Sequence, residues 1–190
     1  GYYVTNNSKK VYNIDQNTLG WDESSRDAHW KNRPKGKPFF AIFNNGLTHE
    51  SSLHPSRNTV KPGIPLNQVR VPAYLPDTET VRDRIASYYT RIQEMDSFVA
   101  KQLKDLEDAG LAEDTIVFYY SDHGGIMPRS KRFVYDSGTH VPLIVRFPKK
   151  WAHLSPHKPG TQTDERVGFV DFAPTLLSLI GADIPVHMQG

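Results

Sequence analysis

Apolar and polar residues follow one another along the chain in blocks that predict both strands and helices. Four short runs are rich in β-branched or aromatic residues, as strands are, and they cover residues 1–5, 38–45, 116–120 and 141–147. The run at 116–120 is apolar or aromatic throughout, which is typical of a strand that is buried on both faces of a parallel sheet.

Helical periodicity appears most clearly after Thr78. Apolar residues recur there every three or four positions up to Leu106, which predicts one helix of about 30 residues with Thr78 as its N-cap and Gly110 at its end. A second helix is predicted over 171–180, with Asp171 as cap and Gly181 as its stop. Strands separated by helices and long connections predict an α/β fold, with a mostly parallel central sheet flanked by helices.

The connecting segments are polar. One short helix is predicted over 24–31, and the proline-rich stretch 51–78 is predicted to be a surface loop rather than part of the core. No apolar run approaches the roughly 18 residues that a membrane span needs, so no membrane partner is expected.

Composition narrows the class of protein. A chain of 190 residues suits one domain of ordinary size, and its formal charge of +2 is too small to indicate nucleic acid as a partner. The absence of cysteine excludes disulfides and thiolate metal sites.

Polar side chains that can carry chemistry follow the predicted strands. Asp122 and His123 come directly after the strand at 116–120, and His49 follows the strand at 38–45. Lys9 follows the first strand, and Lys131 lies in a basic loop after the third. Ligands of α/β sheets bind at the carboxyl ends of strands, so we expect these side chains to share one site.

Each of these residues also has an ordinary structural interpretation. An Asp-His pair before two glycines is often only turn chemistry, and a lysine in a loop is usually solvated. The functional interpretation rests on their common position. A carboxylate and an imidazole can bind a divalent cation, and two lysines with a further histidine can neutralise sulfate or phosphate, as hydrolysis of such an ester requires.

Several segments resemble motifs of the sulfatases of the alkaline-phosphatase superfamily, in the order in which that family has them. They are GYYVTNNSK, PFFAIFNNGLTHE, TIVFYYSDHGG, KRFVYDSGTHVPLIVRFP and VGFVDFAPTLLSLIGADIP, which together span nearly the whole chain. They particularly resemble the bacterial members described as heparan N-sulfatase-like. The resemblance implies an alkaline-phosphatase-like fold, incomplete here, in which residues 1–190 form the central part of the catalytic domain.

The resemblance also implies a role for each site residue. Asp122 and His123 match the ligands of a divalent metal, calcium in most sulfatases, although a histidine ligand also suits zinc or manganese. Lys9 and Lys131 match catalytic lysines that bind the sulfate, and His49 matches the catalytic histidine that contacts the sulfate and the leaving group. Val11 departs from the family, because many sulfatases have a histidine there.

The family nucleophile is a formylglycine made from Cys or Ser in Cys/Ser-x-Pro-x-Arg, and this segment has no such motif. We therefore expect the nucleophile outside this segment, and the 190 residues alone to be inactive. The resemblance implies hydrolysis of sulfate esters or sulfamates, on a sulfated small molecule or glycan, by a periplasmic or secreted enzyme. The alternatives are a phosphoester or phosphonate hydrolase of the same superfamily, and an inactive sugar- or anion-binding relative.

Overall fold

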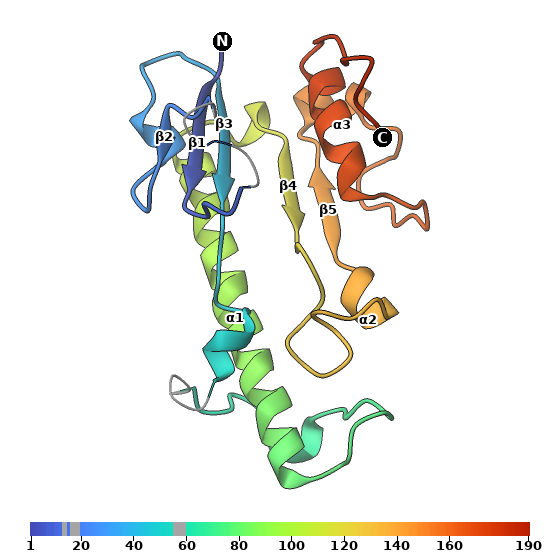
Figure 1. Cartoon of the computed structure of the whole chain (residues 1–190). Helices are drawn as coiled ribbons and strands as arrows, with labels where there is room; N and C mark the ends of the chain where they lie inside the picture. The colour runs from blue at the N-terminus through green and yellow to red at the C-terminus, as the bar shows by residue number, and fades with distance from the viewer. Residues whose placement is uncertain (13–14, 16–19, 55–59) are drawn as a thin grey trace. The chain divides into compact units, whose positions relative to one another are not determined.

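The computed structural model describes residues 1–12, 15, 20–54 and 60–190 (Figure 1). The chain divides into two compact units. The first unit comprises Gly1–Ser97 with Gly125–Pro128, and the second comprises Phe98–Gly124 with Arg129–Gly190. Among the described residues, no helix is both long and apolar enough to cross a membrane.

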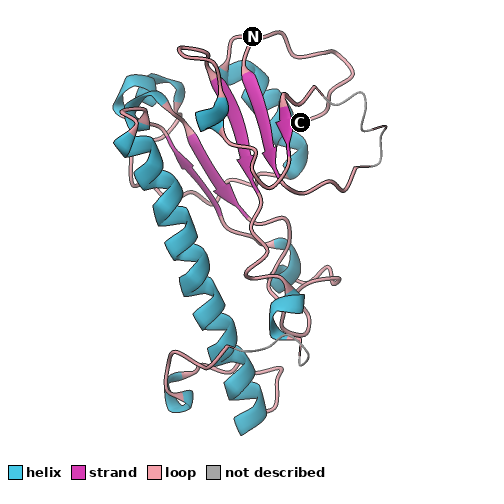
Figure 2. Ribbon diagram, turned by 90° about the vertical axis from the view of Figure 1, so that its left-hand side faces the viewer, coloured by secondary structure: helices cyan, strands magenta, loops and turns pink. Residues whose placement is uncertain are grey.

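The first unit contains a parallel three-stranded sheet, drawn in magenta in Figure 2. Its strands are β1 (Tyr3–Asn7), β2 (Glu23–Ser24) and β3 (Phe39–Phe43), in the order β2-β1-β3. In the register of β1 and β3, Tyr3 lies opposite Phe39 and Asn7 opposite Phe43. The two strands therefore end at the same edge of the sheet, and the predicted parallel α/β arrangement is confirmed.

Helix α1 spans Glu79–Asp108, 30 residues, as the periodicity predicted. The Thr78 hydroxyl accepts a hydrogen bond from the Val81 N–H at 3.3 Å, so Thr78 caps the helix. After the last turn, Gly110 has a φ of 68°, the left-handed conformation that commonly ends helices.

The buried core beside this helix includes a residue from the stretch predicted to lie outside it. Val69 is 4% exposed and packs with Ile85 and Ala86 of α1. The prediction that 51–78 is a surface loop outside the core was therefore wrong at Val69, because the apolar face of α1 needs a packing partner and the segment before the helix supplies it. Residues 55–59 of that stretch lie outside the described residues.

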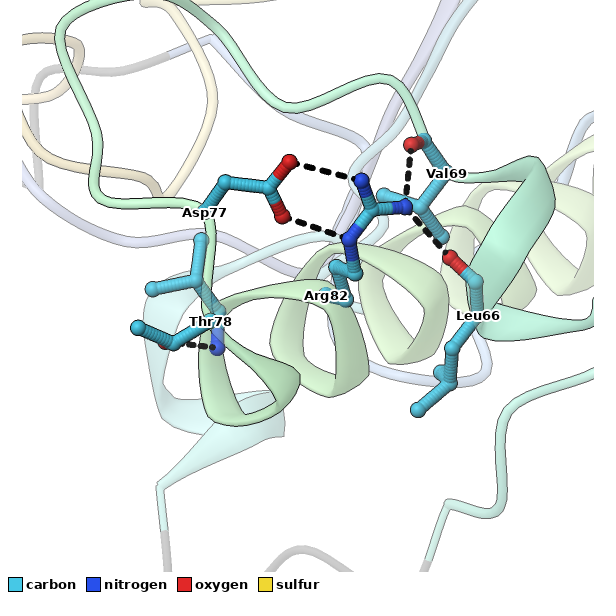
Figure 3. Close-up of polar contacts among 6 residues, drawn as sticks. Leu66, Val69, Asp77, Thr78 and Arg82 are labelled. Atoms are coloured by element: carbon cyan, nitrogen blue, oxygen red, sulfur yellow. Dashed lines mark hydrogen bonds and ion pairs between the residues drawn. The ribbon is translucent and has the colours of Figure 1, made fainter.

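An arginine fastens this segment to the start of α1 (Figure 3). The Arg82 guanidinium donates to both carboxylate oxygens of Asp77, at 2.5 and 2.7 Å, and to the backbone carbonyls of Leu66 and Val69, at 2.9 and 3.1 Å. The planar guanidinium satisfies a carboxylate and two carbonyls at once, which a lysine could not do in this geometry. These hydrogen bonds hold the pKa of Asp77 below its usual range.

The second unit contains a two-stranded antiparallel sheet of β4 (Val117–Tyr120) and β5 (Leu143–Arg146). It also contains two short helices, α2 (Asp136–Thr139) and α3 (Phe172–Leu179). The prediction that the strand at 116–120 is buried on both faces of a parallel sheet was wrong. The partner strand of β4 runs antiparallel to it, and Tyr120 is 42% exposed. The Tyr120 ring packs edge-on against Phe172 of α3, with ring centroids 4.9 Å apart.

One further local prediction was wrong, and another holds only in part. No α-helix forms over 24–31. The structure has the end of β2 there, and a 3₁₀ helix at Trp30–Asn32. The reason is that Trp30 is buried and stacks on Phe39, with ring centroids 5.4 Å apart. Asp171 is the N-cap residue of α3, as predicted, but its side chain makes no capping hydrogen bond to the helix. Its carboxylate instead accepts the Gly168 N–H at 2.6 Å, in the 3₁₀ turn before the helix.

Candidate active site

The five predicted site residues are divided between the two units. Lys9 and His49 belong to the first unit, and Asp122, His123 and Lys131 belong to the second. Each group is described within its own unit.

The loop that carries Lys9 is held at the end of β1 by a buried asparagine. Asn6 is 2% exposed, and its amide nitrogen donates to the Lys9 carbonyl at 2.7 Å and to the Tyr12 hydroxyl at 2.8 Å. Its side-chain oxygen accepts from the Asn44 amide at 3.1 Å, which joins this loop to the loop after β3. The hydrogen bond between the side chains of Asn6 and Asn44 therefore links the loop of Lys9 to the loop that leads to His49. The Lys9 side chain itself is exposed.

His49 is exposed and precedes a 3₁₀ helix at Glu50–Leu53, which it caps. Its Nδ1 accepts the Ser51 backbone N–H at 3.2 Å and lies 2.9 Å from the Ser51 hydroxyl. A backbone N–H can only donate, so Nδ1 must hold a lone pair. The proton of the neutral ring is therefore on Nε2, which makes that atom a hydrogen-bond donor.

His123 has the opposite arrangement. Its Nδ1 lies 2.8 Å from the carbonyl oxygen of Gly124, and the Ser121 hydroxyl donates to the carbonyl of His123 itself at 2.6 Å. A carbonyl can only accept, so Nδ1 carries the proton, and Nε2 of the neutral ring holds a lone pair. That Nε2 is 3.7 Å from Oδ1 of Asp122.

These two groups suit a divalent cation. A carboxylate oxygen and an imidazole lone pair at 3.7 Å repel each other unless a proton or a cation neutralises them, and a backbone carbonyl on the other ring nitrogen is the usual support of a metal-binding histidine. Among the described residues, no three His, Cys, Asp or Glu side chains are grouped closely enough to hold a metal ion. Asp122 and His123 alone would supply two ligands, fewer than the six to eight oxygens, roughly, that calcium takes.

The predicted metal loop and the loop of Lys131 are in contact within the second unit. The Gly124 N–H donates to the Gly138 carbonyl at 2.9 Å. A Cβ added to Gly124 would lie 1.8 Å from the Ser137 carbonyl oxygen, and one added to Gly138 would lie 2.4 Å from that of Ser130. Both positions therefore require glycine, and their close packing brings the segment of Lys131 against the segment of Asp122 and His123.

The backbone on either side of Ser130-Lys131 is in an uncommon conformation. Arg129 and Arg132 have φ values of 69° and 73°, a left-handed region that costs a non-glycine residue about 1 to 3 kcal/mol. The Ser137 hydroxyl donates to the Arg129 carbonyl at 2.6 Å, and the Arg129 guanidinium lies 4.9 Å from the centre of the Tyr135 ring. Contacts of Arg129 with Ser137 and Tyr135 thus hold the turn that contains the half-buried Lys131. The sequence does not reveal this left-handed turn, because arginine is not typical of that conformation.

Comparison with known proteins supports the resemblance seen in the sequence. The family model described as Sulfatase matches residues 3–182. An ulvan-active sulfatase of Formosa agariphila is 39% identical over 224 aligned positions, which include the whole chain and 37% of that protein. Human N-sulphoglucosamine sulphohydrolase is 33% identical over 63% of the chain and 23% of its own length.

A third relative, the N-acetylglucosamine-6-O-sulfatase of Bacteroides thetaiotaomicron, is 33% identical over 54% of the chain and 18% of its own length. The chain thus spans less than two fifths of the length of each of these three relatives. Because the sulfatase match covers nearly all of its residues, the chain belongs to the sulfatase family.

Proposed function

We propose that the complete protein hydrolyses the sulfate ester or sulfamate of a sulfated carbohydrate, using a formylglycine nucleophile that lies outside this segment. Family membership supports the reaction class. The names of relatives active on ulvan and on N-acetylglucosamine 6-O-sulfate support a sugar substrate. The inference that the enzyme works in the periplasm or outside the cell rests on the family resemblance and stays a prediction.

The observation that carries the proposal is the opposite hydrogen bonding of Nδ1 in the two histidines, which indicates opposite tautomers of their neutral rings. Asp122 and the Nε2 lone pair of His123 would hold a divalent cation, for which calcium is our first choice and zinc or manganese the alternatives. Such a cation, when bound, would polarise the nucleophile and a sulfate oxygen. His49 instead offers an N–H at Nε2, which suits an oxyanion or a leaving group that gains negative charge.

The lysines complete the charge balance. An oxygen of the nucleophile would form a bond to sulfur as the bond between sulfur and the leaving oxygen or nitrogen breaks. Negative charge would thereby move onto the leaving atom, which then takes up a proton, while the sulfate keeps its own charge. The ammonium groups of Lys9 and Lys131 would neutralise the sulfate, and the His49 Nε2–H would stabilise the leaving atom. Val11 is 79% exposed and has no group that can transfer a proton, so any proton transfer needed at its position must come from another residue.

The test uses the full-length protein with 4-nitrophenyl sulfate and, in parallel, 4-nitrophenyl phosphate. We expect release from the sulfate, loss of release on treatment with a chelator, and recovery on addition of calcium, with zinc and manganese compared. Release from the phosphate alone would show a phosphoester hydrolase. Binding of inorganic sulfate without turnover of either compound would show an inactive relative. The 190-residue chain alone should release no sulfate.

A further inference from the structure

The loop between β3 and His49 contains the pair Asn45-Gly46, and Asn45 is the only asparagine of the chain that precedes a glycine. Glycine has no Cβ, so its backbone nitrogen approaches the side chain of a preceding asparagine more easily than that of another residue does. This approach begins deamidation, in which water replaces ammonia on the asparagine side chain. Sequence alone does not decide the outcome, because a folded loop can hold the two groups apart.

The structure holds the Asn45 side chain against the backbone that follows it. Its Oδ1 accepts the Leu47 N–H at 2.7 Å, as in an Asx turn. The ring of atoms that this hydrogen bond closes includes both Cγ of Asn45 and the backbone nitrogen of Gly46. The bond also draws electron density from Cγ. The side chain is therefore kept near the Gly46 nitrogen and is polarised for attack by it.

Both reacting groups are available. Within the part of the chain that the structure describes, neither the Gly46 N–H nor the Asn45 side-chain amide donates a hydrogen bond. Gly46 is exposed, Asn45 is half-buried, and both line a surface hollow of about 510 Å³, which admits the water that the reaction consumes.

Asn44 provides the contrast within the same loop. The residue that follows it has a Cβ, and its own side-chain nitrogen donates to Oδ1 of Asn6 at 3.1 Å and to the Asn7 carbonyl at 3.3 Å. Its amide group is thus held by the loop of Lys9, whereas that of Asn45 is not.

We propose that Asn45 is a self-modification site, which the folded protein converts to a mixture of aspartate and isoaspartate. The Gly46 nitrogen gives its proton to hydroxide and bonds to Cγ of Asn45. The bond from Cγ to the side-chain nitrogen breaks, and that nitrogen takes up a proton from water and leaves as ammonia. Water then adds to either carbonyl carbon of the cyclic imide, and the bond from that carbon to the ring nitrogen breaks. No oxidant or reductant is needed.

The products change the loop that carries His49. The His49 N–H donates to the Gly46 carbonyl at 3.1 Å, so the turn before His49 begins at the residue whose nitrogen reacts. Isoaspartate adds a further carbon to the backbone there, and both products add a negative charge to a loop that would contact sulfate. The expected loss of activity rests on the proposed function, whereas the modification itself does not.

The experiment incubates the full-length protein at mildly alkaline pH in water enriched in heavy oxygen, and then identifies its peptides by chromatography and mass spectrometry. We expect Asn45 to become aspartate and isoaspartate with uptake of heavy oxygen. Asn67 is the matched control, because it is exposed and precedes Gln68, and it should remain asparagine over the same time.

Gly46→Ala tests the attacking nitrogen. A Cβ added to Gly46 would meet no described atom within 4 Å, so the variant should fold as wild type does. The added methyl group hinders the approach of the nitrogen, and conversion of Asn45 should slow about tenfold or more. Equal rates in wild type and Gly46→Ala would overturn the proposal.

Wild type unfolded in urea at the same pH tests the contribution of the fold. Conversion of Asn45 in the folded protein supports the proposal, and conversion that occurs only after unfolding contradicts it. Circular dichroism during the incubation confirms that the folded sample stays folded.

Activity separates the two proposals. After incubation, wild type should lose turnover of 4-nitrophenyl sulfate in proportion to the converted fraction, while Gly46→Ala keeps its starting activity. If fresh wild type turns over no sulfate, the proposed function fails and the peptide masses still decide the modification. Full activity after complete conversion would contradict the effect on the His49 loop.

Discussion

The loops of His49 and His123 look alike in sequence, since each places an imidazole shortly after a strand, yet the two rings face opposite backbone groups. Nδ1 of His49 meets a backbone N–H and Nδ1 of His123 meets a backbone carbonyl. The first ring therefore offers a proton at Nε2, and the second offers a lone pair. The comparison teaches that the role of a histidine is decided by the backbone group beside its other ring nitrogen.

The two loops also differ in how they are held. The His49 loop relies on side chains, because Asn45 and Ser51 supply its hydrogen bonds. The His123 loop relies on close backbone packing, in which Gly124 lies against the segment of Ser137 and Gly138. We therefore expect the His123 loop to tolerate added volume far less well.

The largest effect should come from removing the carboxylate that directly precedes His123. Asp122→Ala in the full-length protein should lower kcat/KM for an aryl sulfate by about a thousandfold or more, since a catalytic metal supplies several kcal/mol. Metal content measured by mass spectrometry should fall with it, while Asp164→Ala, an exposed control, should retain both. Unchanged metal content and turnover in Asp122→Ala would remove the metal assignment.

The next effect concerns the groups expected to contact the sulfate. Lys9→Ala, Lys131→Ala and His49→Ala should each lower kcat/KM by about 100- to 1000-fold, because each removes a positive charge or a donor. Melting temperatures should stay near that of wild type. Lys10→Ala, next to Lys9 in the same loop, is the control and should remain active. If a variant loses its fold while the surviving folded fraction turns over normally, that residue is structural.

The lone pair of His123 can be tested by a matched pair of variants. Asparagine supplies a carbonyl oxygen where histidine supplies a nitrogen, so His123→Asn should keep metal affinity and activity within about tenfold of wild type. His123→Ala should lose about 100-fold or more in metal affinity, because the loss of a residue that only supports a ligand already costs about 10- to 100-fold. Nitrogen NMR shifts of the two rings provide the direct readout: the His49 proton should be on Nε2 and the His123 proton on Nδ1 in the neutral rings, and the same tautomer in both would break the comparison.

The packing of the His123 loop predicts a difference between adjacent glycines. Gly124→Ala would place a methyl group on a backbone oxygen, and should lower the free energy of unfolding by about 1 to 3 kcal/mol or more. Gly125→Ala would meet the Tyr88 hydroxyl at 2.8 Å, which a side chain can relieve by moving, so we expect a cost of about 1 kcal/mol or less. Urea unfolding of the full-length variants measures both, and equal costs would contradict the packing argument.

The smallest effect should come from the anchor at the start of α1, in the unit of His49. The hydrogen bonds from Arg82 lower the pKa of Asp77, so the ionised carboxylate stabilises the folded state above about pH 4, and this stabilisation is lost as pH falls through the lowered pKa. Asp77→Asn should slightly lower Tm at pH 7, and the difference from wild type should shrink on acidification. A difference that persists at the lowest pH of the folded protein would assign the effect to packing.

The sequence predicted α1 from end to end, because its signals are local: a 3.6-residue apolar period, a capping threonine and a terminal glycine. It also predicted β1 and β3 and the loops after them that carry Lys9 and His49. It was wrong where distant residues decide the outcome. Trp30 leaves its predicted helix to pack on Phe39.

By itself, the sequence determined the sulfatase family, the α/β class and which side chains follow the strands, since residue types in order are all that these inferences need. Only the tertiary structure decided the protonation of the two rings, the contact of Gly124 with Gly138 and the left-handed turn around Lys131. The physical reason is that the last two features depend on contacts between residues of different loops and turns, such as Gly124 with Gly138 and Arg129 with Ser137. The tautomer of each ring follows from the direction in which a nearby N–H or carbonyl points, which residue types do not specify.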